Sequence, residues 1–268
     1  MRSTFQKIEQ RKRRLSLSPF CGWLSEAGLE QDALGFAPSM SYFVLGFRDI
    51  LALAKRNNPR TDLDRAINLH CEEDREHWKW FLSDIQKLGY LNTTPEKILG
   101  RIWSDEEQMP RQMIYHITHL IQSESDSRVI LAIIECLEAA FAVFIETLKP
   151  QLVKRDFYEK LSYFGQQHDL GEQSHAMGSW IEGTKDHVLG VPPEAALNQF
   201  ARLDSPPEVE ARAFRFIDSI FDHFELLFAH WNQVAKKALG DDGLGSCDRW
   251  LGPKPTQENR RNSSDANA

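Results

Sequence analysis

The feature that most constrains the fold is the spacing of apolar residues, which recur every three or four positions along most of the chain. Between residues 39 and 57, for example, Phe43, Phe47, Ile50 and Leu51 follow this spacing. It places the side chains on one face of an α-helix, whereas the alternation typical of β-strands is nearly absent. We therefore predict an all-α protein.

Capping residues and helix breakers divide the chain into about seven helices. Thr61 and Asp126 have the character of N-caps, and Gly89 and Gly240 that of stop positions. The predicted helices cover residues 39–57, 61–88, a short stretch from 94, 104–122, 126–149, roughly 154–180 and 205–240. No repeat of fixed period is visible, so we expect one helical bundle over residues 21–240, preceded by an N-terminal arm (1–20) and followed by a polar, disordered tail (241–268).

Charge and composition exclude several classes of function. The net charge of −7 argues against a nucleic-acid partner, and the basic residues 11–14 are expected to be solvated in the arm. The most apolar run, residues 129–145, contains Glu135 and Glu138 and is too short to span a membrane. No secretory signal is apparent, and the four cysteines are widely spaced. These features predict a cytoplasmic protein with reduced thiols.

The first candidate site lies between His70 and His77. An α-helix turns about 100° per residue, so steps of three, four and seven residues return to nearly the same face. His70, Glu73 and His77 therefore line one stripe of the predicted 61–88 helix, with Asp74 beside it. Imidazoles and carboxylates on successive turns commonly hold a metal ion, although a charged surface helix has the same residues.

The second candidate site consists of His168, Glu172 and His175. It has the same residue types over the same span as the first site, in mirrored order. Two antiparallel helices would present these two sets to one point. One such triplet arises easily by chance in a chain with nine histidines, but two mirrored triplets favour a shared site.

The third candidate site is the acid pair Glu135 and Glu138 within the most apolar predicted helix. A helix that is hydrophobic on all sides should be buried, and a buried carboxylate needs a proton, a cation or a metal. No lysine or arginine lies between Arg128 and Lys149 to neutralise them locally. The three segments together offer a ligand set that is typical of iron or manganese carboxylate sites and too rich in oxygen for structural zinc.

With these residues the chain resembles the heme-oxygenase-like di-iron oxidases, seven-helix bundles in which three core helices hold a non-heme di-iron site. The third-helix motif of that family, His-x3-Asp/Glu-x2-His, is matched by His168, Glu172 and His175. The segment from Asn68 to His77 is similar to the family's first metal-binding helix. The resemblance covers roughly residues 40–235.

The resemblance also implies a glutamate ligand from the intervening helix, which corresponds to Glu135 or Glu138. One position departs from the family pattern: many members carry a glutamate seven residues before the first-helix histidine, where this chain has His70. Either His70 binds metal in its place or Glu73 reaches in from the adjacent turn.

The function implied by the resemblance is an oxidase or oxygenase. It would bind Fe(II), as two ions, with Mn(II) as the alternative, and would use O2 to oxidise a small-molecule metabolite. The resemblance names no particular substrate, and it leaves open whether the protein is a homodimer.

Two other functional classes remain open. A metal-free hydrolase similar to the thiaminase/TenA group would use a buried helical cysteine, and Cys136 lies between Glu135 and Glu138. A non-catalytic binding protein would use the same clusters as buried polar networks. A heme oxygenase is disfavoured, because that family binds heme through a histidine near the N-terminus and the first histidine here is His70.

Overall fold

The computed structural model describes residues 1–27, 33–168 and 203–240, and all regular structure within these ranges is helical. Nine α-helices and two 3-10 helices are present there, without a strand, which confirms the predicted all-α class. The α-helices are α1 (Arg2–Ser16), α2 (Pro19–Glu26), α3 (Ser41–Ala54), α4 (Asp62–Asp74), α5 (His77–Lys87), α6 (Pro95–Ile102), α7 (Gln108–Gln122), α8 (Ser127–Lys154) and α11 (Pro207–Gly240). The 3-10 helices are η1 (Ala37–Met40) and η2 (Asp105–Glu107).

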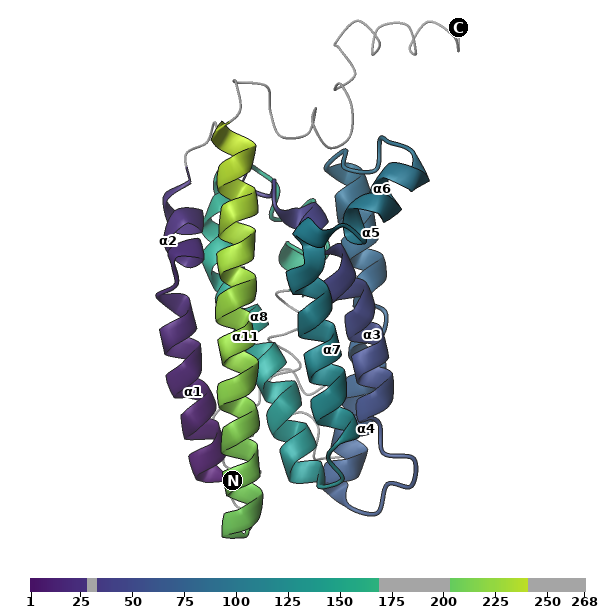
Figure 1. The fold of residues 1–268 in the computed structure, drawn as a ribbon, viewed down its shortest axis with the longest axis vertical. Coiled ribbons are helices and arrows are strands. Elements are labelled where there is room, and N and C mark those ends of the chain that lie inside the picture. The colour runs from purple at the N-terminus through teal and green to yellow at the C-terminus, as the bar shows by residue number, and fades with distance from the viewer. Residues whose placement is uncertain (28–32, 169–202, 241–268) are drawn as a thin grey trace, which may run out of the picture.

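The two longest helices, α8 and α11, pack against each other along the bundle (Figure 1). Asp126 caps the N-terminus of α8 by accepting a hydrogen bond from the backbone N–H of Arg128 at 2.9 Å. The prediction that this helix ends before Pro150 is wrong, because α8 continues to Lys154. Proline removes one backbone hydrogen bond, but Leu152 is fully buried and anchors the last turn.

The N-terminal arm is part of the bundle. Helix α1 packs against α8 and α11 through Phe5, Ile8 and Leu15, all of which are buried. Arg11 is also buried, and its guanidinium donates hydrogen bonds to Asp218 at 2.9 Å and to Asp222 on α11. The expectation of a solvated basic tail is therefore wrong, because basic residues on one face of α1 meet an acidic stripe of α11.

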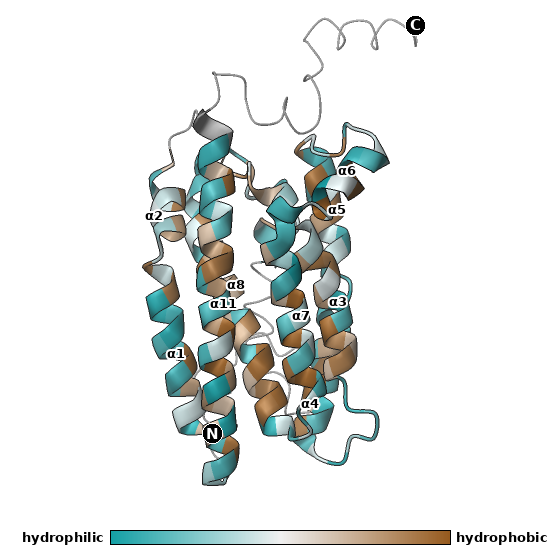
Figure 2. Cartoon of the chain, viewed as in Figure 1, coloured by the Kyte–Doolittle hydropathy of each residue, from teal (hydrophilic) through white to brown (hydrophobic). Residues whose placement is uncertain are grey.

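Helices α3, α4, α5 and α7 form the other side of the bundle (Figure 1). Their apolar residues form stripes that alternate with polar ones around each helix (Figure 2). Gly46 allows α3 to approach α7 closely, because a Cβ at this position would lie 3.0 Å from the side chain of Ile114. The predicted helices at 39–57, 94 onward, 104–122 and 205–240 are each represented in the structure, with small shifts of their ends.

The single helix predicted over residues 61–88 is two helices. Thr61 and Asp64 form a capping box that starts α4, and the helix ends at Asp74. Arg75 and Glu76 form a turn, after which α5 begins at His77. Neither glycine nor proline marks this break, so residue spacing alone could not reveal it. The break is one reason why the structure has more helices than the seven predicted.

The helix predicted over roughly 154–180 is not helical in its first part. Asp156 has φ of 58° just after the end of α8, and residues 157–165 form turns and bends. Helical structure resumes at Gln166 and reaches His168, the last described residue of this segment. The rest of that prediction, and the expected disorder of 241–268, lie outside the described residues.

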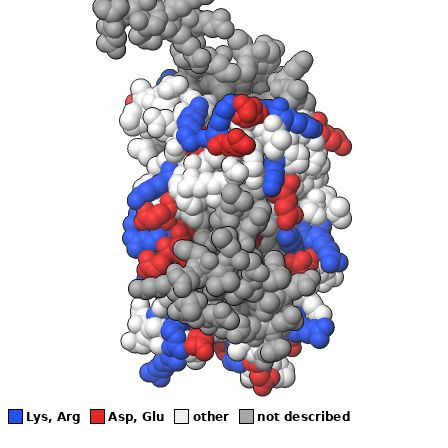
Figure 3. All heavy atoms as spheres, turned by 180° about the vertical axis from the view of Figure 1, so that it is seen from behind, with Lys and Arg blue, Asp and Glu red and all other residues white. Residues whose placement is uncertain are grey.

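The described surface carries acidic and basic side chains that are interspersed (Figure 3). Among the described helices, none combines the length and the apolar character needed to cross a lipid bilayer. Cys21, Cys71 and Cys136 are free thiols and are buried.

Candidate metal centre

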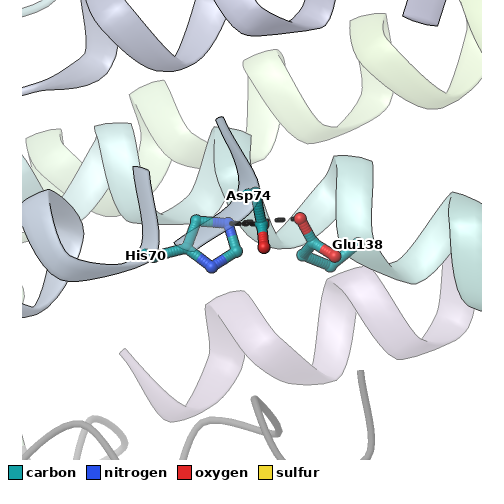
Figure 4. A group of neighbouring side chains, drawn as sticks. All are labelled: His70, Asp74 and Glu138. Carbon is teal, nitrogen blue, oxygen red and sulfur yellow. Dashed lines mark ion pairs between the residues drawn. The ribbon is translucent and has the colours of Figure 1, made fainter. Parts of the chain in front are cut away.

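The centre of the candidate site is a group of three side chains from α4 and α8. His70 and Asp74 lie one turn apart on α4, and Glu138 faces them from α8 (Figure 4). His70 Nε2 lies 3.1 Å from Asp74 Oδ2 and 3.2 Å from Glu138 Oε1. Among the described residues, this is the group of His, Cys, Asp and Glu whose donor atoms converge closely enough to hold one ion, all within 4.8 Å of one another. We call it the α4–α8 cluster.

The α4–α8 cluster is shielded from solvent. His70 is 2% exposed and Asp74 3%, while the Glu138 side chain is 21% exposed. Burial of carboxylates is costly unless a positive charge or hydrogen bonds compensate. The described ion-pair partners of both carboxylates are imidazoles, which are also common metal ligands.

Two further histidines adjoin the cluster through Asp74. Its second oxygen, Oδ1, lies 3.7 Å from His77 Nε2 at the start of α5. The rings of His77 and His168 meet edge to face, with centroids 4.4 Å apart, and both are buried. Asp74 thus lies between His70 on one side and the His77–His168 pair on the other.

His77 and His168 are held by contacts outside the cluster. The His77 ring stacks on Trp80 with centroids 4.4 Å apart. His168 Nδ1 lies 2.9 Å from the backbone carbonyl oxygen of Tyr163. A carbonyl oxygen can only accept a hydrogen bond, so Nδ1 of His168 is the donor and the lone pair of a neutral ring is on Nε2.

A small cavity of about 40 Å³ adjoins these residues. Asp74, Glu138, His77 and His168 contribute to its wall, and the remaining lining is mostly apolar or aromatic. The apolar and aromatic lining residues are Phe43, Val44, Phe47, Trp78, Leu137, Phe141 and Tyr163. One water needs roughly 10–15 Å³ by this measure, so the cavity has room for a few atoms beside the carboxylates.

The other predicted site residues are placed differently. Glu73 is exposed on α4, and Glu135 is half-buried on α8; neither belongs to the α4–α8 cluster. Asp74, which the spacing put beside the stripe, takes the inward position instead. Glu172 and His175 lie outside the described residues, so the mirrored triplet is represented by His168 alone.

Cys136 has the environment of a core thiol. It is fully buried, and burial followed by the charge of Glu135 raises its pKa well above the usual value. Two residues along a helix correspond to a rotation of about 200°, so Cys136 and Glu138 face different sides of α8. The charges that act on Cys136 also include Arg11 of α1 and Asp218 of α11. A thiolate nucleophile is not favoured at this position.

A second buried polar group, formed by Ser39, Arg101, Glu107 and His230, was not predicted from the sequence. We call it the Glu107 cluster. Glu107 is 4% exposed and pairs with Arg101 at 2.9 Å and with His230 Nε2 at 3.1 Å. Ser39 Oγ lies 2.9 Å from the same His230 nitrogen. A serine hydrolase triad needs the acid and the serine on opposite ring nitrogens, so this geometry is not that of a catalytic triad.

Sequence comparisons add no assignment: neither a protein-family model nor a curated protein sequence matches the chain.

Proposed function

We propose that this protein is a non-heme metal-dependent oxidase or oxygenase that acts on a small molecule. The observation that carries the proposal is the convergence of His70, Asp74 and Glu138 in the buried middle of the bundle, with His77 and His168 adjoining through Asp74. Carboxylate and imidazole ligands from facing helices are the usual way in which helical bundles hold iron or manganese.

The spacing of the donor atoms fits an ion. Two donors about 2.1 Å from one metal, at tetrahedral or octahedral angles, lie roughly 3.0–3.4 Å apart. The separations of 3.1 and 3.2 Å from His70 Nε2 to Asp74 and Glu138 fall in this interval. An ion between them would place the ring and both carboxylates at bonding distance with little movement.

Two ions are proposed, with Asp74 shared between them. His70, Glu138 and Asp74 Oδ2 would hold one, while His77, His168 and Asp74 Oδ1 would contribute to the other. This arrangement, in a heme-oxygenase-like bundle, is the one implied by the family resemblance. Fe(II) is the proposed metal, with Mn(II) as the alternative, and bound iron would supply the activation of O2.

The residues of the chain have separate roles in this proposal. The apolar wall formed by Phe43, Phe47 and Phe141 would bind the apolar part of a substrate and exclude water from the metals. The Tyr163 carbonyl holds the proton of His168 on Nδ1, which leaves Nε2 available as a ligand. Substrate and O2 would meet in the cavity beside Glu138.

Metal reconstitution of matched variants tests the proposal. The protein is loaded anaerobically with Fe(II) or Mn(II), desalted and analysed for metal, and its O2 consumption is then measured. We expect one to two equivalents in the wild type and a large loss in His70→Ala and Glu138→Gln. Glu146→Gln is the control, because Glu146 lies on the same helix, is 69% exposed and pairs only weakly with Lys12 at 3.5 Å.

Two results would contradict the proposal. If the wild type retains neither iron nor manganese, the cluster is a buried polar network and the protein belongs to the non-catalytic class. If His70→Ala and Glu138→Gln retain as much metal as Glu146→Gln, the metal is bound elsewhere.

A further inference from the structure

Asp84 is a completely buried carboxylate outside the α4–α8 cluster. It lies on α5, seven residues after His77, and none of its surface is exposed. Its carboxylate accepts three backbone hydrogen bonds from one loop, at 2.8 Å from Ser162, 2.7 Å from Tyr163 and 3.1 Å from Phe164. Lys87 Nζ lies 3.5 Å away at the rim. Hydrogen bonds to an ionised acceptor are about twice as strong as neutral ones, so Asp84 fixes this loop tightly.

The loop held by Asp84 carries both described backbone partners of His168. The carbonyl of Ser162 accepts the backbone N–H of His168 at 3.0 Å, and the carbonyl of Tyr163 accepts Nδ1–H at 2.9 Å. The N–H groups of Ser162 and Tyr163 point to Asp84 while their carbonyls point to His168. The two peptide groups thus connect the buried carboxylate with the imidazole.

Gly165 closes the same loop against the preceding turn. A Cβ at this position would lie 2.2 Å from the carbonyl oxygen of Tyr158 and 2.3 Å from that of Leu161. The backbone N–H of Gln166 donates to the Tyr158 carbonyl at 2.8 Å. The loop is therefore restrained from two sides, by the carboxylate of Asp84 and by close backbone packing.

We propose that Asp84 is a positioning residue that sets the tautomer and orientation of His168. By fixing the Tyr163 carbonyl, it keeps the proton on Nδ1 and leaves the Nε2 lone pair for a metal. The consequence for metal binding rests on the proposed function; the effect on the tautomer does not. Partners of this kind behind a metal-bound histidine contribute substantially to metal affinity.

A carboxylate is suited to this role and an amide is not. Both oxygens of Asp84 accept, Oδ1 from Ser162 and Oδ2 from Tyr163 and Phe164. In Asp84→Asn, one oxygen is replaced by an NH2 group, which would face a backbone N–H, so at least one of the three bonds is lost. The Tyr163 carbonyl would then be free to turn away from His168.

The tautomer can be measured directly in the metal-free protein. Nitrogen-15 NMR of labelled histidines, with His168 assigned through His168→Gln, distinguishes Nδ1–H from Nε2–H at a pH where the ring is neutral. We expect the wild type to be the Nδ1–H form and Asp84→Asn to show a mixture of both forms. An Nε2–H form in the wild type would overturn the proposal, whether or not the variant folds.

The matched control is Glu107→Gln. Glu107 is also a buried carboxylate with three partners, but it belongs to the Glu107 cluster and has no contact with the 162–164 loop. It should destabilise the fold without changing the His168 tautomer. If Glu107→Gln shifts the tautomer as much as Asp84→Asn does, the effect is general loosening and the positioning role is wrong.

Metal binding gives the second measurement. With Fe(II) or Mn(II) as the probe, we expect Asp84→Asn to weaken the occupancy of one site by roughly 10- to 100-fold, as loss of an outer partner does, with His168→Ala as the positive control. A wild type that binds no metal contradicts the proposed function, and the tautomer result still decides the role of Asp84. A wild type that binds metal, with an unchanged tautomer in Asp84→Asn, contradicts only the positioning role.

Discussion

The α4–α8 cluster and the Glu107 cluster contain similar side chains but balance their charges differently. Both combine a buried carboxylate with a histidine at about 3.1 Å. In the Glu107 cluster the guanidinium of Arg101 also pairs with the acid. In the α4–α8 cluster the described partners of both carboxylates are imidazoles.

The pKa of Glu107 shows what the arginine does. Burial alone would raise that pKa, but the hydrogen bond with His230 and the charge of Arg101 outweigh it, and the pKa falls below its usual value. The Glu107 cluster thus carries its own counter-charge and stabilises the junction of η1, η2 and α11. The α4–α8 cluster has two acids on imidazoles, which is the composition that suits a cation. Charge balance therefore distinguishes a structural network from a candidate metal site more clearly than residue type does.

The largest expected effect of this difference is on stability, at the Glu107 cluster. Glu107→Gln removes the charge that compensates the buried guanidinium of Arg101, and loss of one partner of a buried ion pair costs about 3 kcal/mol. Denaturant unfolding of the metal-free protein measures this loss. Metal content of the folded variant should stay at the wild-type level; a fall would mean that the two clusters are coupled.

The converse change is Asp74→Asn. It should weaken metal binding by more than about 100-fold, because it alters the carboxylate shared by both proposed ions. The free energy of unfolding of the metal-free protein should change by less than about 1 kcal/mol, since one buried charge is removed at the same time. Metal titration and denaturant unfolding on the same sample decide the point. A loss of stability as large as that of Glu107→Gln would show that Asp74 is part of a structural network.

A third arrangement, imidazole against imidazole, predicts a pH dependence. The rings of His116 and His223 are stacked with centroids 3.8 Å apart, and burial, followed by the charges of His223 and His119, lowers the pKa of His116 to about 4. The unfolded chain, with a value near 6.5, binds the proton more tightly, so this contribution to stability is fully present above pH 6.5 and is lost as the pH falls to about 4.

The measurement is the difference in unfolding free energy between pH 7 and pH 4.5. Because His116 is partly exposed, we expect the contribution to be only about 1 kcal/mol. His116→Phe, which retains an aromatic ring against His223, should flatten the profile in this window. An unchanged slope in the variant would assign the pH dependence to other groups.

The smallest expected effect is at Cys136. Although it lies between Glu135 and Glu138 in the sequence, it faces away from the α4–α8 cluster. Cys136→Ala should keep metal binding and O2 consumption and lower the free energy of unfolding by about 1 kcal/mol through lost packing. Loss of activity with full metal content would instead support the thiol hydrolase.

The sequence predicted the helical class and most helices, and it singled out His70, His77, Glu138 and His168 before the structure placed them close together. It did not predict that Asp74, rather than Glu73, faces inward. The reason is the turn at Arg75–Glu76, which separates α4 from α5 without glycine or proline and ends the continuous stripe.

The Glu107 cluster could not be predicted for a different reason. Its four residues lie at positions 39, 101, 107 and 230, on elements far apart in the chain. No local spacing connects them, so only tertiary packing brings them together. Asp84 was overlooked because a buried aspartate on a helix has no signature until the loop that it binds is known.

The close packing at Gly165 affects how much sequence variation the chain can tolerate. Gly22 and Gly100 have open space where a Cβ would lie, whereas any side chain at 165 would collide with two carbonyl oxygens. In a library of random variants, positions 22 and 100 should accept many residues and position 165 only glycine. Intolerance at 165 in a selection for metal loading would then report on the loop that carries Tyr163, although Gly165 itself has no group that could bind a metal.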